Sequence, residues 1–246
     1  MQIEVILTPT LYSHRQMHSN HATVVVDVLR ATTAICAAFR AGATTITPLQ
    51  SLDTLSYYYQ QGYTIAAERN GAKVIVEDVP ATCGNSPTEY LNMDLHNQRL
   101  AYSTTNGTLA IHTAAHDSRQ LYIGAFANLS VLSKHLIRHE RIVILCSGWK
   151  GDPCIEDTLF AGALCKILTE RNNNAILIND TARYSTDLWS LASPDLYSFC
   201  SKATHVHRLQ HMGYDNDIHF ALQIDTCPVV PYATSENGSI VLQLEN

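Results

Sequence analysis

The chain has 246 residues, of which 46% are hydrophobic and 15% charged, a composition typical of a globular protein and not of a disordered one. Its 16 basic residues stand against 22 acidic ones, giving a formal net charge of −6, and no run of Lys and Arg occurs. This balance excludes binding to a nucleic-acid backbone as the expected function. A chain of this length buries roughly 70–75% of its unfolded surface, which allows one large domain or two small lobes.

Strand-like and helix-like segments alternate along most of the sequence. The first ten residues predict a strand, and residues 23–29 (TVVVDVL) form the continuous β-branched run of a strand buried on both faces. A helix is predicted over residues 31–42, where a glycine ends it. Further strands are predicted at residues 44–49, 63–68, 73–79, 100–105, 121–125, 141–147, 175–180, 217–224 and 239–244. Further helices are predicted at residues 51–62, 108–116, 127–139 and 155–170.

This alternation predicts an α/β fold with three layers, α/β/α, around mostly parallel or mixed sheets. Residues 23–42 and 141–164 both run from a strand through a polar turn to a helix and an Ala-Gly pair. This repeated pattern favours two similar lobes, residues 1–135 and 136–246, which could be intertwined into one functional unit.

The cellular compartment is predicted from what the sequence lacks. The seven cysteines are scattered without a CxxC pair, so neither a zinc site nor a disulfide framework has its usual spacing. The N-terminus has no basic segment before a long apolar stretch, as a signal peptide would. No apolar run approaches the roughly 20 residues of a membrane span. We therefore expect a cytoplasmic protein without a membrane partner.

Polar residues follow the predicted strands at equivalent positions. In open α/β sheets, ligands bind beyond the carboxyl ends of the parallel strands. In chain order these residues are Asp27, Arg30, Glu68, Arg69, Asn85, Ser86, Thr104, Thr105, Asn106, Gly107, Asn128, Glu156 and Asp157. Helix N-termini and arginine side chains both suit phosphate or sulfonate groups. Each turn alone also fits a helix cap or a simple ion pair, whereas six of them together favour a binding site.

Carboxylates among anion-binding turns need a separate reason, because they repel an anionic ligand. A divalent cation such as Mg²⁺ supplies one by bridging carboxylate and phosphate oxygens. We expect Mg²⁺ ligands among Asp27, Glu68, Glu156 and Asp157, and a catalytic group of Asp27, Arg30, Glu68 and Asp157. The residues expected to bind substrate are Arg69, Asn85, Ser86, Thr104, Thr105, Asn106, Gly107 and Asn128.

Two other patterns are assigned no function. Asp215 and Asp217 are spaced like the aspartate pair of haloacid-dehalogenase phosphatases, but no apolar strand precedes them. His205, His207 and His211 have no acidic or cysteine ligand at helical spacing, so they predict a helix surface and not a metal site.

Several segments together carry a family resemblance. They are VVVDVLRATTAI, AERNG, GNSPTEY, STTNGT, GAFAN and CSGWKGDPCIEDTLFAGA. In order and approximate spacing the chain resembles the ComB-type 2-phosphosulfolactate phosphatases, from about residue 22 to the tail DIHFALQIDTCPVVP. The resemblance implies Mg²⁺-dependent hydrolysis of 2-phosphosulfolactate to sulfolactate and phosphate, on a route to coenzyme M. It also implies an α/β fold of two intertwined lobes.

Other functions stay open at this point. The same turns suit a protein that binds or senses a small phosphorylated or sulfonated organic acid without turnover. A phosphoryl or nucleotidyl transferase is disfavoured, because neither GxxxxGK[ST] nor GxGxxG is present. For a phosphatase, water activated by the metal is favoured over a side-chain nucleophile. The expected partner is a small anionic phosphoacid, and a homo-oligomer is allowed.

Overall fold

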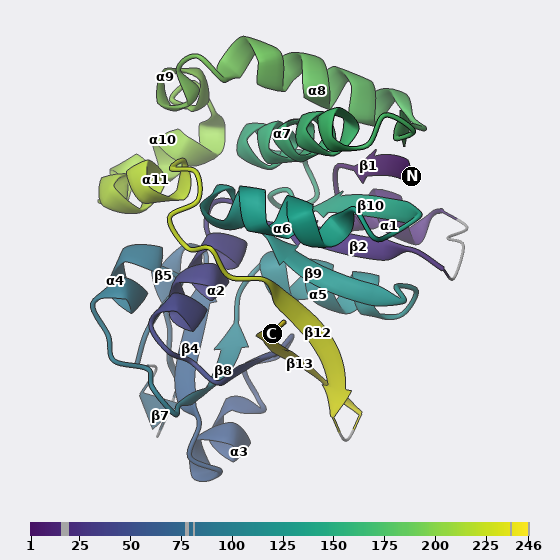
Figure 1. The fold of residues 1–246 in the computed structure, drawn as a ribbon. Coiled ribbons are helices and arrows are strands. Elements are labelled where there is room, and N and C mark those ends of the chain that lie inside the picture. Colours follow the sequence, from purple (N-terminus) through teal and green to yellow (C-terminus); the bar gives the residue numbers. More distant parts are fainter. Residues whose placement is uncertain (16–19, 77–78, 81, 237, 246) are drawn as a thin grey trace.

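Figure 1 shows the computed structural model of the chain, in which one large sheet is covered by helices. The structure describes residues 1–15, 20–76, 79–80, 82–236 and 238–245. In spatial order the sheet contains β11 (Ile176–Leu177), β1 (Gln2–Ile6), β10 (Arg141–Cys146), β2 (Ala22–Val26), β9 (Gln120–Gly124), β12 (Pro231–Glu236), β13 (Ser239–Leu244), β3 (Thr45–Pro48), β8 (Arg99–Ser103), β4 (Thr64–Arg69) and β5 (Ala72–Lys73). A separate pair is formed by β6 (Ile75–Val76) and β7 (Val79–Pro80).

The helices follow the strands along the chain. They are α1 (Pro9–Ser13), α2 (Ala31–Arg40), α3 (Leu55–Gln60), α4 (Pro87–Leu91), α5 (Gly107–Ala115), the 3₁₀ turn η1 (Phe126–Asn128), α6 (Leu129–Leu136), α7 (Ile155–Arg171), α8 (Asp180–Ala192), α9 (Leu196–Cys200), α10 (Thr204–His211) and α11 (Asp215–Ala221). The last three follow one another without an intervening strand and, as Figure 1 shows, gather on one side of the molecule.

Two groups of parallel strands flank a hairpin from the C-terminal end. Strands β11, β1, β10, β2 and β9 pair in parallel, as do β3, β8 and β4. The antiparallel pair β12–β13 joins the two groups, through Tyr232 opposite Tyr122 and Leu242 opposite Ile46. The predicted α/β sheet is therefore confirmed as one mixed, mostly parallel sheet of 11 strands.

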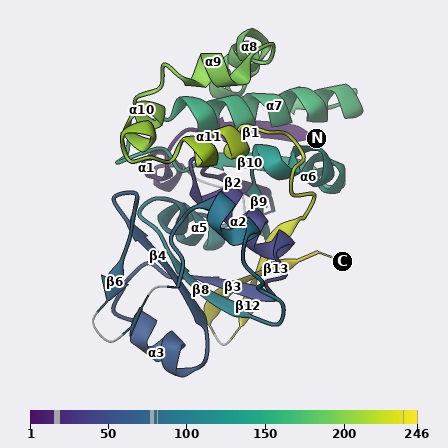
Figure 2. The same cartoon turned by 90° about the vertical axis from the view of Figure 1, so that its left-hand side faces the viewer.

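Alternate residues of the central strands face different helices. Val24 and Val26 of β2 belong to one buried cluster with Phe160 of α7. Val25, between them, belongs to a second cluster with Ile111 of α5. Figure 2 shows α7 and α5 on opposite sides of these strands. This follows from the strand period of two, which sends successive side chains to opposite faces.

The sheet runs across the boundary predicted between residues 135 and 136. Strand β10 comes from the second predicted lobe, yet it lies between β1 and β2 of the first. The C-terminal hairpin likewise lies between β9 and β3. Two similar lobes therefore stay a prediction, and the strands of both ranges share one sheet.

The prediction of a strand at residues 217–224 is wrong, because this segment begins inside the helix α11. Ile218, Ala221 and Leu222 are buried, with exposed fractions of 0%, 0% and 8%. Their spacing of three and four residues is the period of one helix face, which a short apolar run conceals. The correction matters because α11 brings a buried carboxylate to the site described below.

Two other predicted strands are short in the structure. The segment at residues 175–180 contributes only β11. Residues 73–79 contain the end of β5, all of β6 and the start of β7, with residues 77–78 outside the described part. Within the described residues, no helix has both the length and the apolar character that crossing a membrane requires.

Candidate active site

A small cavity lies between the carboxyl end of β2 and the carboxyl ends of β4 and β8. Its volume is about 30 Å³. It is lined by Asp27, Leu29, Arg30, Glu68, Asn70, Gly71, Asn85, Thr104, Thr105, Asn106, Trp149, His205, Arg208 and Leu209. Seven of the predicted site residues are among these, so the structure brings the turns after three strands together.

Asp27 is buried at the start of α2. Its Oδ1 accepts a hydrogen bond from the Ala31 N–H at 3.2 Å. Burial raises the pKa of the Asp27 carboxyl to about 6, and the nearby carboxylates of Glu68 and Glu156 contribute to the rise. The ionised Asp27 carboxylate is therefore poorly solvated in this pocket.

Glu68 joins the turn after β4 to the turn after β8. One carboxylate oxygen accepts the Gly71 N–H and, at 3.2 Å, the Thr105 hydroxyl. The other accepts the Thr105 N–H at 3.3 Å. Because Glu68 is only 4% exposed, these contacts fix its carboxylate at the wall of the cavity.

The STTNGT turn starts α5 beside Asp27. A Cβ added to Gly107 would lie 2.4 Å from the Ala31 Cβ and 3.0 Å from Asp27 Oδ2, so only glycine allows α5 to approach α2 this closely. The Thr104 hydroxyl caps the helix by accepting the Thr108 N–H at 3.3 Å. The Asn106 side chain lines the cavity and makes no capping bond.

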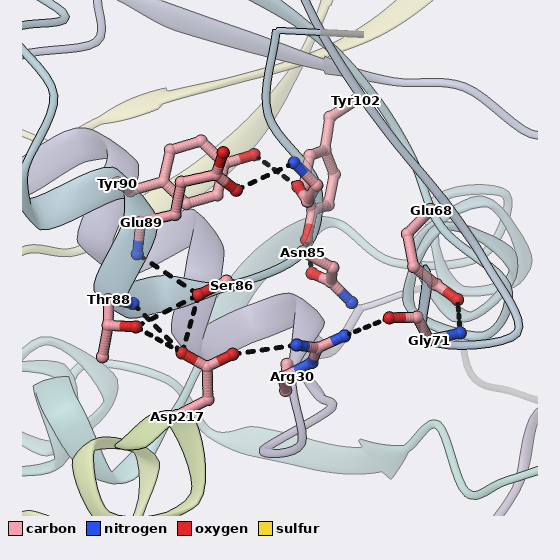
Figure 3. Close-up of polar contacts among 11 residues, drawn as sticks. Arg30, Glu68, Gly71, Asn85, Ser86, Thr88, Glu89, Tyr90, Tyr102 and Asp217 are labelled. Carbon is pink, nitrogen blue, oxygen red and sulfur yellow. Dashed lines mark hydrogen bonds and ion pairs between the residues drawn. The ribbon is translucent and has the colours of Figure 1, made fainter. Parts of the chain in front are cut away.

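Arg30 is held in place by α11 and by the turn after β4, as Figure 3 shows. Its Nη1 donates to Asp217 Oδ2 at 2.8 Å, and its Nη2 donates to the Gly71 carbonyl at 2.7 Å. The guanidinium carbon lies 3.8 Å from the centre of the Tyr214 ring. With 3% exposure, Arg30 is a buried, oriented cation whose five N–H donors are only partly used by these two bonds.

The GNSP segment contacts the same acidic residue. In Figure 3, Asp217 Oδ1 accepts the Ser86 hydroxyl at 2.7 Å and the Thr88 hydroxyl at 2.6 Å. Ser86 also caps α4 by accepting the Glu89 N–H at 3.2 Å. The structure thus places Ser86 behind the cavity wall. Asn85 does line the cavity, with its Oδ1 bonded to the Tyr102 hydroxyl.

Asp157 connects the turns after β2 and β10. Its two carboxylate oxygens accept the Val28 N–H at 2.8 Å and the Gly148 N–H at 3.1 Å. Burial raises the pKa of Asp157 well above its usual value, with Asp27 and Glu156 adding to the rise. The backbone amides that it binds favour a role in shaping the site.

Glu156 is bonded to a histidine that the sequence pattern assigned to a helix surface. Glu156 Oε1 accepts the His205 Nδ1–H at 2.8 Å, while Oε2 is buried without a hydrogen-bond partner among the described residues. The His205 side chain is 10% exposed, so the surface prediction is wrong for it and confirmed for the exposed His207 and His211.

Comparison with known proteins agrees with the motifs that form this cavity. The family model described as "2-phosphosulpholactate phosphatase" matches residues 6–236. The chain belongs to this family. It is therefore placed among the phosphoric monoester hydrolases.

Curated relatives align over most of their length. A "Probable 2-phosphosulfolactate phosphatase" from Pseudothermotoga lettingae is 34% identical, covering 93% of this chain and 94% of that protein. A protein of the same name from Prochlorococcus marinus is also 34% identical, with 85% and 87% covered. One from Microcystis aeruginosa is 31% identical over 99% of this chain and all of that protein. The resemblance read from the six motifs is thereby confirmed.

Arg69 lies beside the family's TTNGT turn but not in the cavity. Its Nη1 donates to the Glu68 carbonyl at 2.7 Å and its Nη2 to the Ser103 hydroxyl at 2.9 Å. It lines a neighbouring hollow of about 210 Å³ that shares Thr104 and Thr105 with the cavity. If Arg69 contacts the substrate as predicted, it would do so from this neighbouring hollow, on the opposite side of the Thr104–Thr105 turn from the cavity.

Asn128 is fully buried away from the cavity lining. Its amide donates to the Ile123 and Val229 carbonyls, both at 3.0 Å, and its oxygen accepts the Ala125 N–H at 3.0 Å. The structure therefore supports a role for Asn128 in holding β9 to the C-terminal segment.

Trp149 follows β10 and lies in the segment CSGWKGDPCIEDTLFAGA, whereas His205 and Arg208 of α10 were not assigned to the site from the sequence. Arg208 donates to the Asn70 carbonyl and lies 5.3 Å from the centre of the Trp149 ring, which stacks on His205 at 5.8 Å. No local pattern separates His205 and Arg208 from surface positions, because α10 reaches the cavity only through the tertiary fold. They add a second guanidinium to the site.

Proposed function

We propose that this chain hydrolyses 2-phosphosulfolactate to sulfolactate and phosphate with Mg²⁺ as cofactor. The observation that carries the proposal is the pairing of two guanidinium groups, Arg30 and Arg208, with two buried carboxylates, Asp27 and Glu68, around one cavity. The substrate offers phosphate, sulfonate and carboxylate groups. Arginine matches all three with planar hydrogen bonding, and the carboxylates suit a cation that shares the phosphate.

The residues fit Mg²⁺ by their chemistry. Asp27 and Glu68 offer oxygen donors at the same cavity. Burial is the main cause of the raised pKa of Asp27, and a divalent cation would stabilise its buried carboxylate. We assign the ion to these two side chains, with Asp157 shaping the adjoining turns. When bound, Mg²⁺ neutralises charge on the phosphoryl oxygens and makes water a better nucleophile.

The chain's own groups orient the phosphoryl group and stabilise its charge. Phosphate-monoester hydrolysis needs accelerations up to about 10²¹-fold, so charge stabilisation must supply most of the effect. Arg30 has N–H donors left over after its two bonds, and Asn85 and Asn106 bring amide side chains to the same wall. Besides holding the ion, Glu68 and Asp27 would position the attacking water at this wall.

Substrate entry requires the cavity to widen. One water molecule needs about 10–15 Å³, so a volume of about 30 Å³ has room for only two or three. The bond from Arg208 to the Asn70 carbonyl crosses between α10 and the turn after β4. We infer that Arg208 leaves this carbonyl to bind an acidic group of the substrate. Sulfolactate formation on the route to coenzyme M, or in related sulfolactate metabolism, is the metabolic setting that the family resemblance suggests.

The test is phosphate release from 2-phosphosulfolactate and from related phosphoacids, with Mg²⁺ and with EDTA. The proposal predicts turnover that EDTA abolishes and that favours 2-phosphosulfolactate. Turnover of a different phosphoacid would show that the proposed substrate is wrong and that the proposed reaction, phosphate-monoester hydrolysis, is right. Tight binding of the panel without phosphate release would instead identify a binding protein.

A further inference from the structure

We propose that Cys154, Glu156 and His205 form a binding site for a divalent metal ion of the zinc class. The thiol sulfur, a carboxylate oxygen and a ring nitrogen lie within 4.8 Å of one another. Cys154 and Glu156 flank the first residue of α7, and His205 comes from α10. The site uses neither of the carboxylates assigned to Mg²⁺ and does not depend on the proposed phosphatase activity.

Glu156 supplies the observation that points to a ligand. Its side chain is 1% exposed, and its Oε2 has no hydrogen-bond partner among the described residues. A buried carboxylate oxygen without a partner is unfavourable and rare in folded proteins. Coordination of a cation by Oε2 would satisfy this atom.

The present geometry is close to that of a tetrahedral site. Zinc bonds of about 2.0–2.3 Å place neighbouring ligand atoms roughly 3.3–3.7 Å apart. The three donors already lie within 4.8 Å, and the His205–Glu156 contact is 2.8 Å. Rotation of side chains is therefore enough to admit the ion. Glu156 would offer Oε2, and His205 would offer Nδ1 with its proton carried on Nε2.

The donor set selects the class of metal. Mg²⁺ takes oxygen ligands, whereas a thiolate and an imidazole favour zinc and similar ions. A hollow of about 330 Å³ is lined by all three residues, which gives an entry path and room for a water as fourth ligand. The metal–sulfur bond forms as the Cys154 thiol loses its proton to solvent. Binding would tie α10 to the start of α7.

The experiment is a titration of the reduced, metal-free full chain with Co²⁺, which reports a thiolate ligand by its sulfur-to-metal absorption band. We expect the band to saturate at one ion per chain, to be displaced by Zn²⁺ and to persist in excess Mg²⁺. Cys154→Ser should lose the band and weaken binding at least about tenfold. Cys200→Ser, the matched control at a fully buried cysteine of α9, should keep the absorption band and the wild-type affinity for Co²⁺.

Two outcomes would overturn the proposal: no band in the folded wild-type chain, or an unchanged band in Cys154→Ser. If circular dichroism shows that Cys154→Ser does not fold, Glu156→Gln and His205→Ala decide instead. Each should weaken Co²⁺ binding at least about tenfold, while His207→Ala, at an exposed position of the same helix, should not. Unchanged affinity in both variants would also reject the site.

Discussion

Replacing Asp27 with Asn should stabilise the metal-free protein above about pH 6 and abolish phosphatase activity. Asp27 is 7% exposed. Burial raises the pKa of its carboxyl from 3.8 to about 6; Glu68 and Glu156 add to the rise, while His205 and the Ala31 amide oppose it. The ionised form is therefore less favourable in the folded state than in the unfolded chain.

The sign and size of the effect follow from this difference in pKa. Between 3.8 and about 6 the folded state holds a proton that the unfolded chain has released, so the free energy of unfolding falls as pH rises through this window. A shift of about two units corresponds to about 3 kcal/mol. Asn cannot ionise, and its Oδ1 can still accept the Ala31 N–H. Asp27→Asn therefore removes the fall in the free energy of unfolding that wild type shows as pH rises.

The assay is urea unfolding in EDTA from about pH 4 to about pH 8, followed by circular dichroism. The stability of Asp27→Asn relative to wild type should rise by about 2 kcal/mol from about pH 4 to about pH 6.5 and then level off. Mg²⁺ should stabilise wild type but not the variant. Asp187→Asn, at an exposed position of α8, is the matched control and should show no such rise. A variant less stable than wild type at about pH 7.5, or a difference independent of pH, would refute the reasoning.

Three further substitutions test the cavity wall. Arg30→Lys should lower kcat/KM at least about 100-fold with the fold retained, because lysine lacks the planar fork. Asp217→Asn should cost about 2–4 kcal/mol in urea unfolding by weakening a buried ion pair, and in an Arg30→Ala background its effect on kcat/KM should vanish; additive effects would contradict this coupling. Gly107→Ala should destabilise by about 1–3 kcal/mol, since its Cβ would meet Ala31 at 2.4 Å; unchanged stability and rate would contradict the close packing.

The part of the cavity wall formed by the strand-end turns was predictable because its signal is local. Asp27, Glu68 and Thr104 each follow a recognisable strand, and parallel strands deliver such residues to one edge of a sheet. Gly107 was predictable as part of the same turn. The structure adds the steric reason, which lies in the Ala31 side chain of another helix.

The wall formed by the C-terminal helices was not predictable in the same way. Asp217 lies in a segment whose apolar residues suggested a strand, and its partner Arg30 is 187 residues away. His205 was judged by its neighbours in sequence, none of which is a ligand, whereas Glu156 comes from a helix 49 residues earlier. Periodicity describes which face of a helix is buried, but it does not say against which distant residue that face packs.

The most direct test of the account is the initial rate of phosphate release from 2-phosphosulfolactate by the purified chain with Mg²⁺, beside the same reaction with EDTA. The account predicts rapid release with Mg²⁺, loss of release with EDTA, and recovery when Mg²⁺ is restored. Release at the same rate in EDTA would contradict the proposed cofactor, and no release under either condition would contradict the proposed function.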